Sequence, residues 1–183
     1  MALNATIFKV GLTITDMDRA YYATHPLVLA RHPSETDERM MVRLVAFARH
    51  AQDNLSFGRG LSAEDEADIV LTDLTGAISL WIEIGLPDEK TVRRACGKAD
   101  QVYVYAYGGH TAERWWQQSA SALAKPSNLS VIALPAQSTR ELAALAQRNM
   151  QIQCTIQDGT IWFTDGHQTV EITPAILQTA RKY

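Results

Sequence analysis

The middle of the chain alternates apolar, strand-like segments with amphipathic, helix-like segments, and this order limits the possible folds most strongly. Strand–helix–strand units place neighbouring strands parallel and cover the sheet with helices. We expect strands at residues 68–72, 77–85, 102–107 and 129–134. We also expect three helices: one that begins near Pro87, one over residues 111–124 and one over residues 139–148. The sequence therefore predicts an α/β protein.

Both ends of the chain are typical of antiparallel β-structure. Residues 5–15 alternate apolar and polar side chains, and a second extended segment, residues 21–31, follows the turn residues 16–18, so we expect a hairpin. Near the other end, Asp158-Gly159 and Asp165-Gly166 are two-residue turn signals between three short strands. Parallel pairing in the middle and antiparallel pairing at the ends predict a mixed β-sheet flanked by helices.

Length and charge limit the organisation and the partners. The 183 residues fit one domain, residues 1–183, because a typical domain has about 150 residues. The formal net charge is −3, so any nucleic acid must be bound by a local cluster of cations. Cys96 and Cys154 lack metal-site or redox spacing, and neither a signal peptide nor a membrane span is recognisable. We expect a cytoplasmic protein.

The segment after the hairpin has helical periodicity. Its apolar residues recur at i, i+3, i+4 and i+7, which predicts a helix that begins near Ser34 and ends near Asp53. On this helix the phase places Glu38 on the inward side and directs Arg39 and Arg43 away from it.

Three carboxylates are candidate ligands of a metal ion. The period of two places Glu83 on one face of its strand with Ser79 and Trp81, and Asp68 begins the preceding strand. With Glu38 they would form a site for a hard cation such as Mg²⁺, which prefers oxygen ligands. The alternatives are helix-dipole stabilisation by Glu38, a solvated loop end at Asp68 and an arginine ion pair at Glu83.

Cations and aromatic residues follow the same region. A basic stripe on the next helix either binds phosphate or forms an ordinary solvated face; it contains Lys90, Arg93, Arg94 and Lys98. An aromatic run either stacks on bases or packs in the core; it contains Tyr103, Tyr105, Tyr107, Trp115 and Trp116. The short motifs of serine hydrolases, zinc proteases and nucleotide-cofactor enzymes are absent from the sequence.

Four stretches carry a resemblance to a known family: LARHPSETDERMMVRLVAFA (29–48), GLSAEDEADIVL (60–71), LWIEIGLPDEKTVRRACGKA (80–99) and IQDGTIWFTD (156–165). With the opening MALNATIFK and the pair Trp115-Trp116, the chain resembles the YaeQ proteins of proteobacteria over nearly its whole length. The resemblance implies a restriction-endonuclease-like core, as in the PD-(D/E)XK nuclease superfamily, with an N-terminal hairpin and a C-terminal meander.

The resemblance also implies roles for individual residues. Asp68, preceded here by Ala67, corresponds to the aspartate of the PD half, and Glu83 to the acidic residue of the second half. The lysine position two residues after Glu83 is Gly85. A cation from the following helix would then replace that lysine, with Lys90 and Arg94 as catalytic candidates and Lys98 as a further possibility.

The same resemblance extends to the first long helix, where Glu38 corresponds to a carboxylate beside the metal and Glu35 is a poorer candidate. Two functions follow from it. The first is a metal-dependent nuclease-like protein in which Glu38, Asp68 and Glu83 hold Mg²⁺ and activate water for attack on a phosphodiester of nucleic acid. The second is a catalytically degenerate nuclease-fold protein that binds nucleic acid or a protein partner, with a regulatory role.

Overall fold

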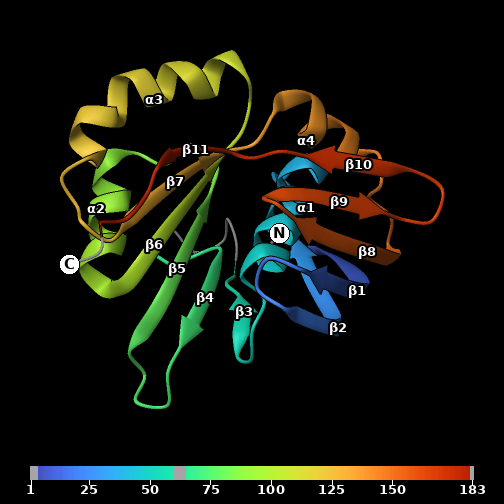
Figure 1. Cartoon of the computed structure of the whole chain (residues 1–183). Helices are drawn as coiled ribbons and strands as arrows, with labels where there is room; N and C mark the ends of the chain where they lie inside the picture. The colour runs from blue at the N-terminus through green and yellow to red at the C-terminus, as the bar shows by residue number, and fades with distance from the viewer. Residues whose placement is uncertain (1–3, 60–64, 182–183) are drawn as a thin grey trace.

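The computed structural model describes residues 4–59 and 65–181, and within these ranges it contains two mixed β-sheets and four helices (Figure 1). In the five-stranded sheet, of order β10-β9-β8-β1-β2, the strands are β1 (Thr6–Asp16), β2 (Tyr21–Arg31), β8 (Asn149–Gln157), β9 (Thr160–Thr164) and β10 (Thr169–Ile172). In the six-stranded sheet, of order β11-β7-β6-β5-β4-β3, they are β3 (Leu55–Phe57), β4 (Ile69–Thr72), β5 (Ile78–Ile84), β6 (Ala99–Ala106), β7 (Leu129–Ala133) and β11 (Ala175–Gln178). The helices are α1 (Asp37–His50), α2 (Glu89–Lys98), α3 (His110–Leu123) and α4 (Ala136–Ala143). Across the described ranges, none of these helices is long and apolar enough to cross a membrane.

The five-stranded sheet joins the two ends of the chain. β1 and β2 form the predicted antiparallel hairpin, and β8, β9 and β10 form the predicted meander. The two parts meet because β1 pairs in parallel with β8, with Lys9 opposite Asn149. The sequence predicts one mixed sheet, and this prediction is wrong in number, since the ends form a second sheet of their own.

The six-stranded sheet contains the predicted strand–helix alternation. β5, β6 and β7 are parallel, whereas β3, β4 and β11 are antiparallel to their neighbours. α2 and α3 lie over one face of this sheet, opposite the side that faces α1 (Figure 1). β3 and β11 are absent from the sequence-based expectation because both are short and lack clear alternation.

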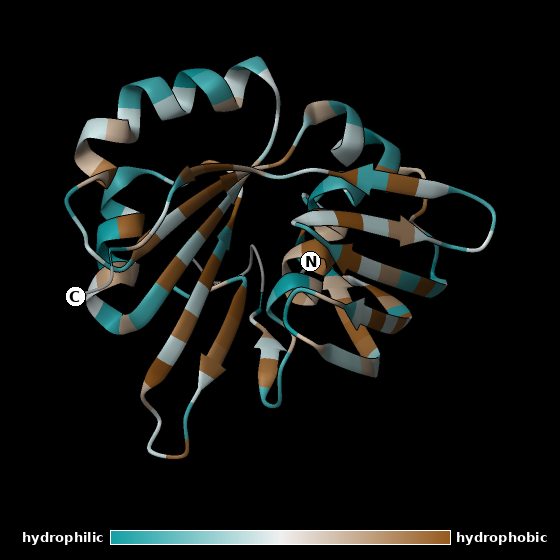
Figure 2. Cartoon of the chain, in the orientation of Figure 1, coloured by the Kyte–Doolittle hydropathy of each residue, from teal (hydrophilic) through white to brown (hydrophobic). Residues whose placement is uncertain are grey.

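Helix α1 lies between the two sheets (Figure 1). One hydrophobic core contains side chains from α1 and from both sheets, and residues 40–48 of the helix are all buried. Figure 2 shows hydrophobic residues along the strands on both sides of α1, whereas the outer helix α3 is largely hydrophilic. The prediction that Arg39 and Arg43 point away from the core is therefore wrong: α1 has a sheet on each flank, and Arg43 is 1% exposed.

Helix starts differ from the sequence-based expectation by a few residues. Thr36 is the N-cap of α1 and accepts a hydrogen bond from the Arg39 amide at 3.1 Å, so the helix begins after Ser34. Asp88 is the N-cap of α2 and accepts from the Thr91 amide at 2.7 Å. α4 begins at Ala136, three residues before the predicted start. Helix ends are the least constrained feature of a periodic pattern.

Candidate functional site

Asp68 is a buried carboxylate directly before β4. Antiparallel pairing places it beside the end of β5, where its amide donates to the Ile82 carbonyl at 3.0 Å. Its Oδ2 accepts from the Ile84 amide at 2.8 Å, and its Oδ1 accepts from Nη2 of Arg39 at 2.7 Å. The residue is 4% exposed, so these bonds are what stabilise the charge.

Glu83 lies on β5, on the face that also presents Trp81. The Trp81 indole Nε1 donates to its Oε1 at 2.7 Å. Burial raises the pKa of Glu83 to about 7, and the negative charge of Asp68 adds to this rise. The hydrogen bond from Trp81 and the positive charge of Arg39 lower the pKa and so oppose the rise. The charges of Asp68 and Arg39 therefore both act on the Glu83 carboxyl group. A carboxyl group with a pKa near neutrality can both hold and release a proton at physiological pH.

Arg39 is the cation of this site, and the sequence reasoning missed it. Its Nη2 donates to Asp68 and, at 3.4 Å, to the Ile84 carbonyl, while Nη1 donates to Oε1 of Glu35 at 3.0 Å. Burial disfavours its charge, but the carboxylates of Asp68 and Glu35 outweigh that effect and raise the pKa of Arg39. Arg39 thus joins helix α1 to the ends of β4 and β5.

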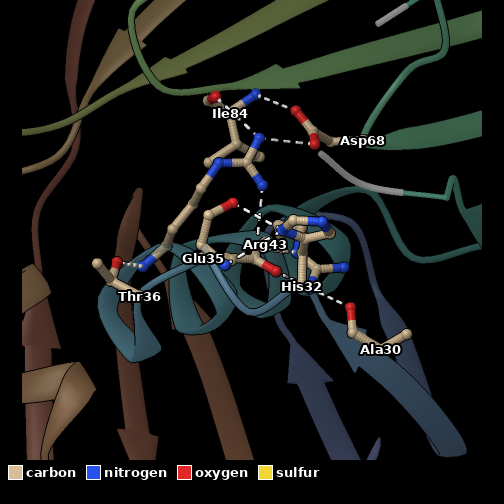
Figure 3. A network of polar contacts seen from close by, with 9 residues as sticks. Ala30, His32, Glu35, Thr36, Arg43, Asp68 and Ile84 are labelled. Carbon is tan, nitrogen blue, oxygen red and sulfur yellow. Dashed lines mark hydrogen bonds and ion pairs between the residues drawn. The ribbon is translucent and has the colours of Figure 1, made fainter. Parts of the chain in front are cut away.

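Glu35, which accepts a hydrogen bond from Arg39, also forms a buried ion pair with Arg43 (Figure 3). Nε and Nη2 of Arg43 donate to Oε1 and Oε2 of Glu35 at 2.8 and 2.9 Å, and the two side chains are 1% and 0% exposed. Nη2 of Arg43 also donates to the Ala30 carbonyl at 3.1 Å. A bidentate pair of this kind fixes the Glu35 carboxylate, which in turn holds Arg39.

Glu38 does not join the other two carboxylates. Its Oε1 accepts from the Thr139 hydroxyl at 2.7 Å, which ties α1 to α4. Among the described residues, no group of three His, Cys, Asp or Glu side chains is arranged to hold a metal ion. The predicted three-carboxylate cluster is thus not formed. Side chains of α1 contact two different neighbours: Glu38 contacts α4, whereas Arg39 contacts Asp68 beside β4 and β5.

Tyr107 lies directly after β6. Burial raises the pKa of its hydroxyl; the charge of Arg39 opposes this and the charge of Glu38 adds to it. The polar site therefore extends along the carboxyl ends of the parallel strands, from Glu83 on β5 to Tyr107 beyond β6.

The basic stripe of α2 makes other contacts. Arg94 pairs with Asp65 and Arg93 with Glu89, and the Lys98 Nζ lies 5.8 Å from the centre of the Trp81 ring. Lys90 is exposed in the first turn of α2. Within the described ranges, neither Lys90 nor Arg94 has an ion pair with Asp68 or Glu83. The expectation that a cation from α2 reaches the carboxylates is corrected here, since the cation comes from α1.

Gly85 occupies the position where the resemblance places a lysine, and its backbone explains the difference. Its backbone φ is +108°, a conformation that residues with a side chain rarely adopt. Its amide donates to the Tyr105 carbonyl at 2.9 Å. A Cβ there would have nothing within 4 Å. The strand thus ends in a glycine turn with open space beside Gly85.

A separate cavity of about 310 Å³ lies at the carboxyl ends of β6 and β7, between α3 and the start of α4. Its wall is mainly apolar, with Leu134 and Trp116 among its residues, and it includes neither Asp68 nor Glu83. The acidic site is therefore distinct from this cavity and depends on the polar network around Arg39.

The architecture and the site together define a class: a mixed α/β protein of two sheets, with a carboxylate–guanidinium network where the central helix meets the six-stranded sheet. The family model described as "YaeQ protein" matches residues 1–174. The chain therefore belongs to the YaeQ family.

Relatives and solved structures agree with this assignment. The chain is 47% identical over 172 residues to "Uncharacterized protein YaeQ" of Salmonella typhi and 44% identical to that of Escherichia coli K12, covering 94% of this chain and 95% of either relative. The crystal structure of the YaeQ protein from Xanthomonas axonopodis pv. citri has a TM-score of 0.93 at 50% identity, covering 96% of this chain and 99% of that one. The YaeQ structure from Pseudomonas syringae has a TM-score of 0.92 at 32% identity, covering 97% and 98%.

Proposed function

We propose that this protein is a metal-dependent, nuclease-like hydrolase of phosphodiester bonds, with a core of the PD-(D/E)XK type. One observation supports the proposal: Asp68 accepts a hydrogen bond from the guanidinium of Arg39, and the charges of both residues act on Glu83 of the adjacent strand β5. A cytoplasmic location accords with two free thiols, Cys96 and Cys154.

Asp68 and Glu83 fit a hard dication by residue type and by electrostatics. Mg²⁺ is usually bound through one or two carboxylates, with water and substrate phosphate completing its shell. Within the described residues, Glu83 accepts one hydrogen bond, on Oε1, and burial raises its pKa, with the charge of Asp68 adding to the effect. These two residues would hold Mg²⁺, which lowers the pKa of bound water and so supplies a nucleophile near neutral pH.

The remaining residues would position the substrate. A guanidinium matches the geometry of a phosphate with two parallel hydrogen bonds, so Arg39 is suited to hold a phosphodiester beside the carboxylates. Gly85 leaves open space at the end of β5, so a phosphate can approach the backbone there. Glu35, itself fixed by Arg43, holds Arg39 in the first turn of α1.

A second candidate function is favoured by the contacts of Asp68. Both of its carboxylate oxygens already accept hydrogen bonds from the protein, and the lysine position is a glycine. These features fit a catalytically degenerate nuclease fold that binds nucleic acid, or a protein partner, without cleaving it.

Calorimetric titration with Mn²⁺ and Mg²⁺, together with cleavage of labelled DNA and RNA oligonucleotides, distinguishes the two candidates. We expect Glu83→Gln to weaken divalent binding by about tenfold or more, since one of two charged ligands is lost, and to abolish cleavage. Glu38→Gln is the matched control, because it removes the same charge from α1 at a site bonded to Thr139.

The hydrolase proposal is overturned if Glu83→Gln binds divalent ions as the wild type does and no cation supports cleavage. Salt-sensitive binding in EDTA, with a log–log slope of about −3 to −4 from three or four phosphate contacts, would then support the degenerate module.

A further inference from the structure

We propose that Arg39 is an internal cation that occupies the Asp68 site until a phosphate group draws it away and a divalent ion replaces it. This inference deepens the proposed function and rests on it. In this proposal, Arg39 neutralises Asp68 while no substrate is bound, and the same guanidinium recognises the phosphate group.

The position of the guanidinium is the first step. Nη2 of Arg39 lies 2.7 Å from Oδ1 of Asp68 and 3.4 Å from the carbonyl oxygen of Ile84. Hard divalent cations use carboxylate oxygens and backbone carbonyl oxygens as ligands. Arg39 therefore places one positive charge among the oxygens that a divalent ion would need, and the two cations compete for Asp68.

The charges around Arg39 would remain balanced if a divalent ion took the place of its guanidinium at Asp68. Glu35 has two cationic partners, Arg39 and Arg43, and the Arg43 pair alone is bidentate and buried. If Arg39 moves away, Glu35 stays neutralised and only Asp68 loses its counterion. A divalent ion then meets two negative charges, those of Asp68 and ionised Glu83, which balance its own charge of two.

The Arg39 side chain is accessible to solvent at the site, whose other residues are shown in Figure 3. In the view of Figure 3, Asp68 and Ile84 lie on the sheet side, and Glu35 and Arg43 lie on the side of α1. The Arg39 side chain is 13% exposed, compared with 1% for Arg43. Of these two arginines, Arg39 is thus the one with a route to solvent, and a phosphate is the anion that its planar donors match best.

The test measures Mn²⁺ affinity of the full chain by calorimetry, with Arg39→Gln compared with the wild type. A neighbouring arginine lowers the proton affinity of an aspartate by about one to three pKa units, and a competing dication meets a penalty of the same order. We therefore expect Arg39→Gln to bind Mn²⁺ about tenfold tighter or more, and inorganic phosphate more weakly than the wild type. Arg140→Gln is the control, since it removes the same charge from an exposed position on α4.

Arg39→Lys keeps a charge but cannot bridge Glu35 and Asp68 as a planar fork does, so we expect an intermediate Mn²⁺ affinity. Thermal unfolding with and without Mn²⁺ provides a second readout, because an ion that binds the folded state alone raises Tm. The rise should be larger in Arg39→Gln than in the wild type. Equal or weaker Mn²⁺ binding in both Arg39 variants, with folded circular-dichroism spectra, overturns the inference.

The outcome is separable from that of the proposed function. A gain of Mn²⁺ affinity in Arg39→Gln without cleavage by any variant supports the internal cation and rejects the hydrolase. Cleavage by the wild type without any gain of affinity in the Arg39 variants supports the hydrolase and rejects the internal cation.

Discussion

The Glu35–Arg43 pair provides a direct test of how the site is held in the fold. Both side chains are buried, at 0% and 1% exposure, and two hydrogen bonds of 2.8 and 2.9 Å join them. Glu35→Gln leaves the Arg43 charge in the core without its carboxylate, whereas Arg39 keeps Asp68 as its partner. Removal of one member of a buried ion pair costs about 3–5 kcal/mol, so the folded state should lose about that much.

Urea denaturation followed by tryptophan fluorescence measures this loss, since the chain has four tryptophans. For a protein of this length the same loss lowers Tm by about 6–20 °C. Glu35→Leu/Arg43→Met should recover a large part of the stability, because apolar side chains of similar size replace buried ion pairs well. Glu89→Gln is the control for an exposed pair and should cost less than about 1 kcal/mol. A Glu35→Gln variant within 1 kcal/mol of wild type, or a double variant no more stable than Glu35→Gln, refutes the reasoning.

Two further predictions concern Glu83 and Thr139. The pKa of Glu83 rises from 4.5 to about 7 on folding, so its ionisation opposes the folded state: relative to Glu83→Gln, wild-type stability should fall by about 3 kcal/mol between pH 4.5 and 7, and parallel urea-midpoint profiles would contradict this. Thr139→Val removes the hydroxyl that donates to Glu38 at 2.7 Å, so we expect a loss of about 1–2 kcal/mol and faster amide exchange in α4; unchanged exchange would argue against the α1–α4 tether.

Local pattern predicts the strands well and the central helix less well. The alternation in residues 5–15 and 21–31 is sufficient for the hairpin, because a strand with one buried face specifies its own register. The burial of α1 between two sheets depends instead on contacts between segments far apart in sequence, such as the parallel pairing of β1 with β8. A helical phase gives the angle between side chains, but not how many neighbours surround the helix.

The same limit separates the predicted from the missed site residues. Asp68 and Glu83 are identified from the sequence because they belong to adjacent strand segments, and the pairing of β4 with β5 is a local property. Arg39 is missed because it contacts residues of another element. One signal was available: Glu35 stands four residues before Arg39 and eight before Arg43, so a carboxylate just before the helix can meet two cations on its first turns.

The glycine at position 85 shows why the cation of this site comes from the helix and not from the strand. A lysine there would have to adopt a φ of +108°, which is costly for any residue with a Cβ, so the end of β5 is built for a turn. α1 instead contributes Arg39, which pairs with Glu35 just before the helix, and Arg43 neutralises Glu35 independently. The positive charge beside Asp68 is therefore set by how α1 packs between two sheets. Under the proposed function, the chemistry of this site would depend on whether Arg39 can leave Asp68, and not on a lysine at the end of β5.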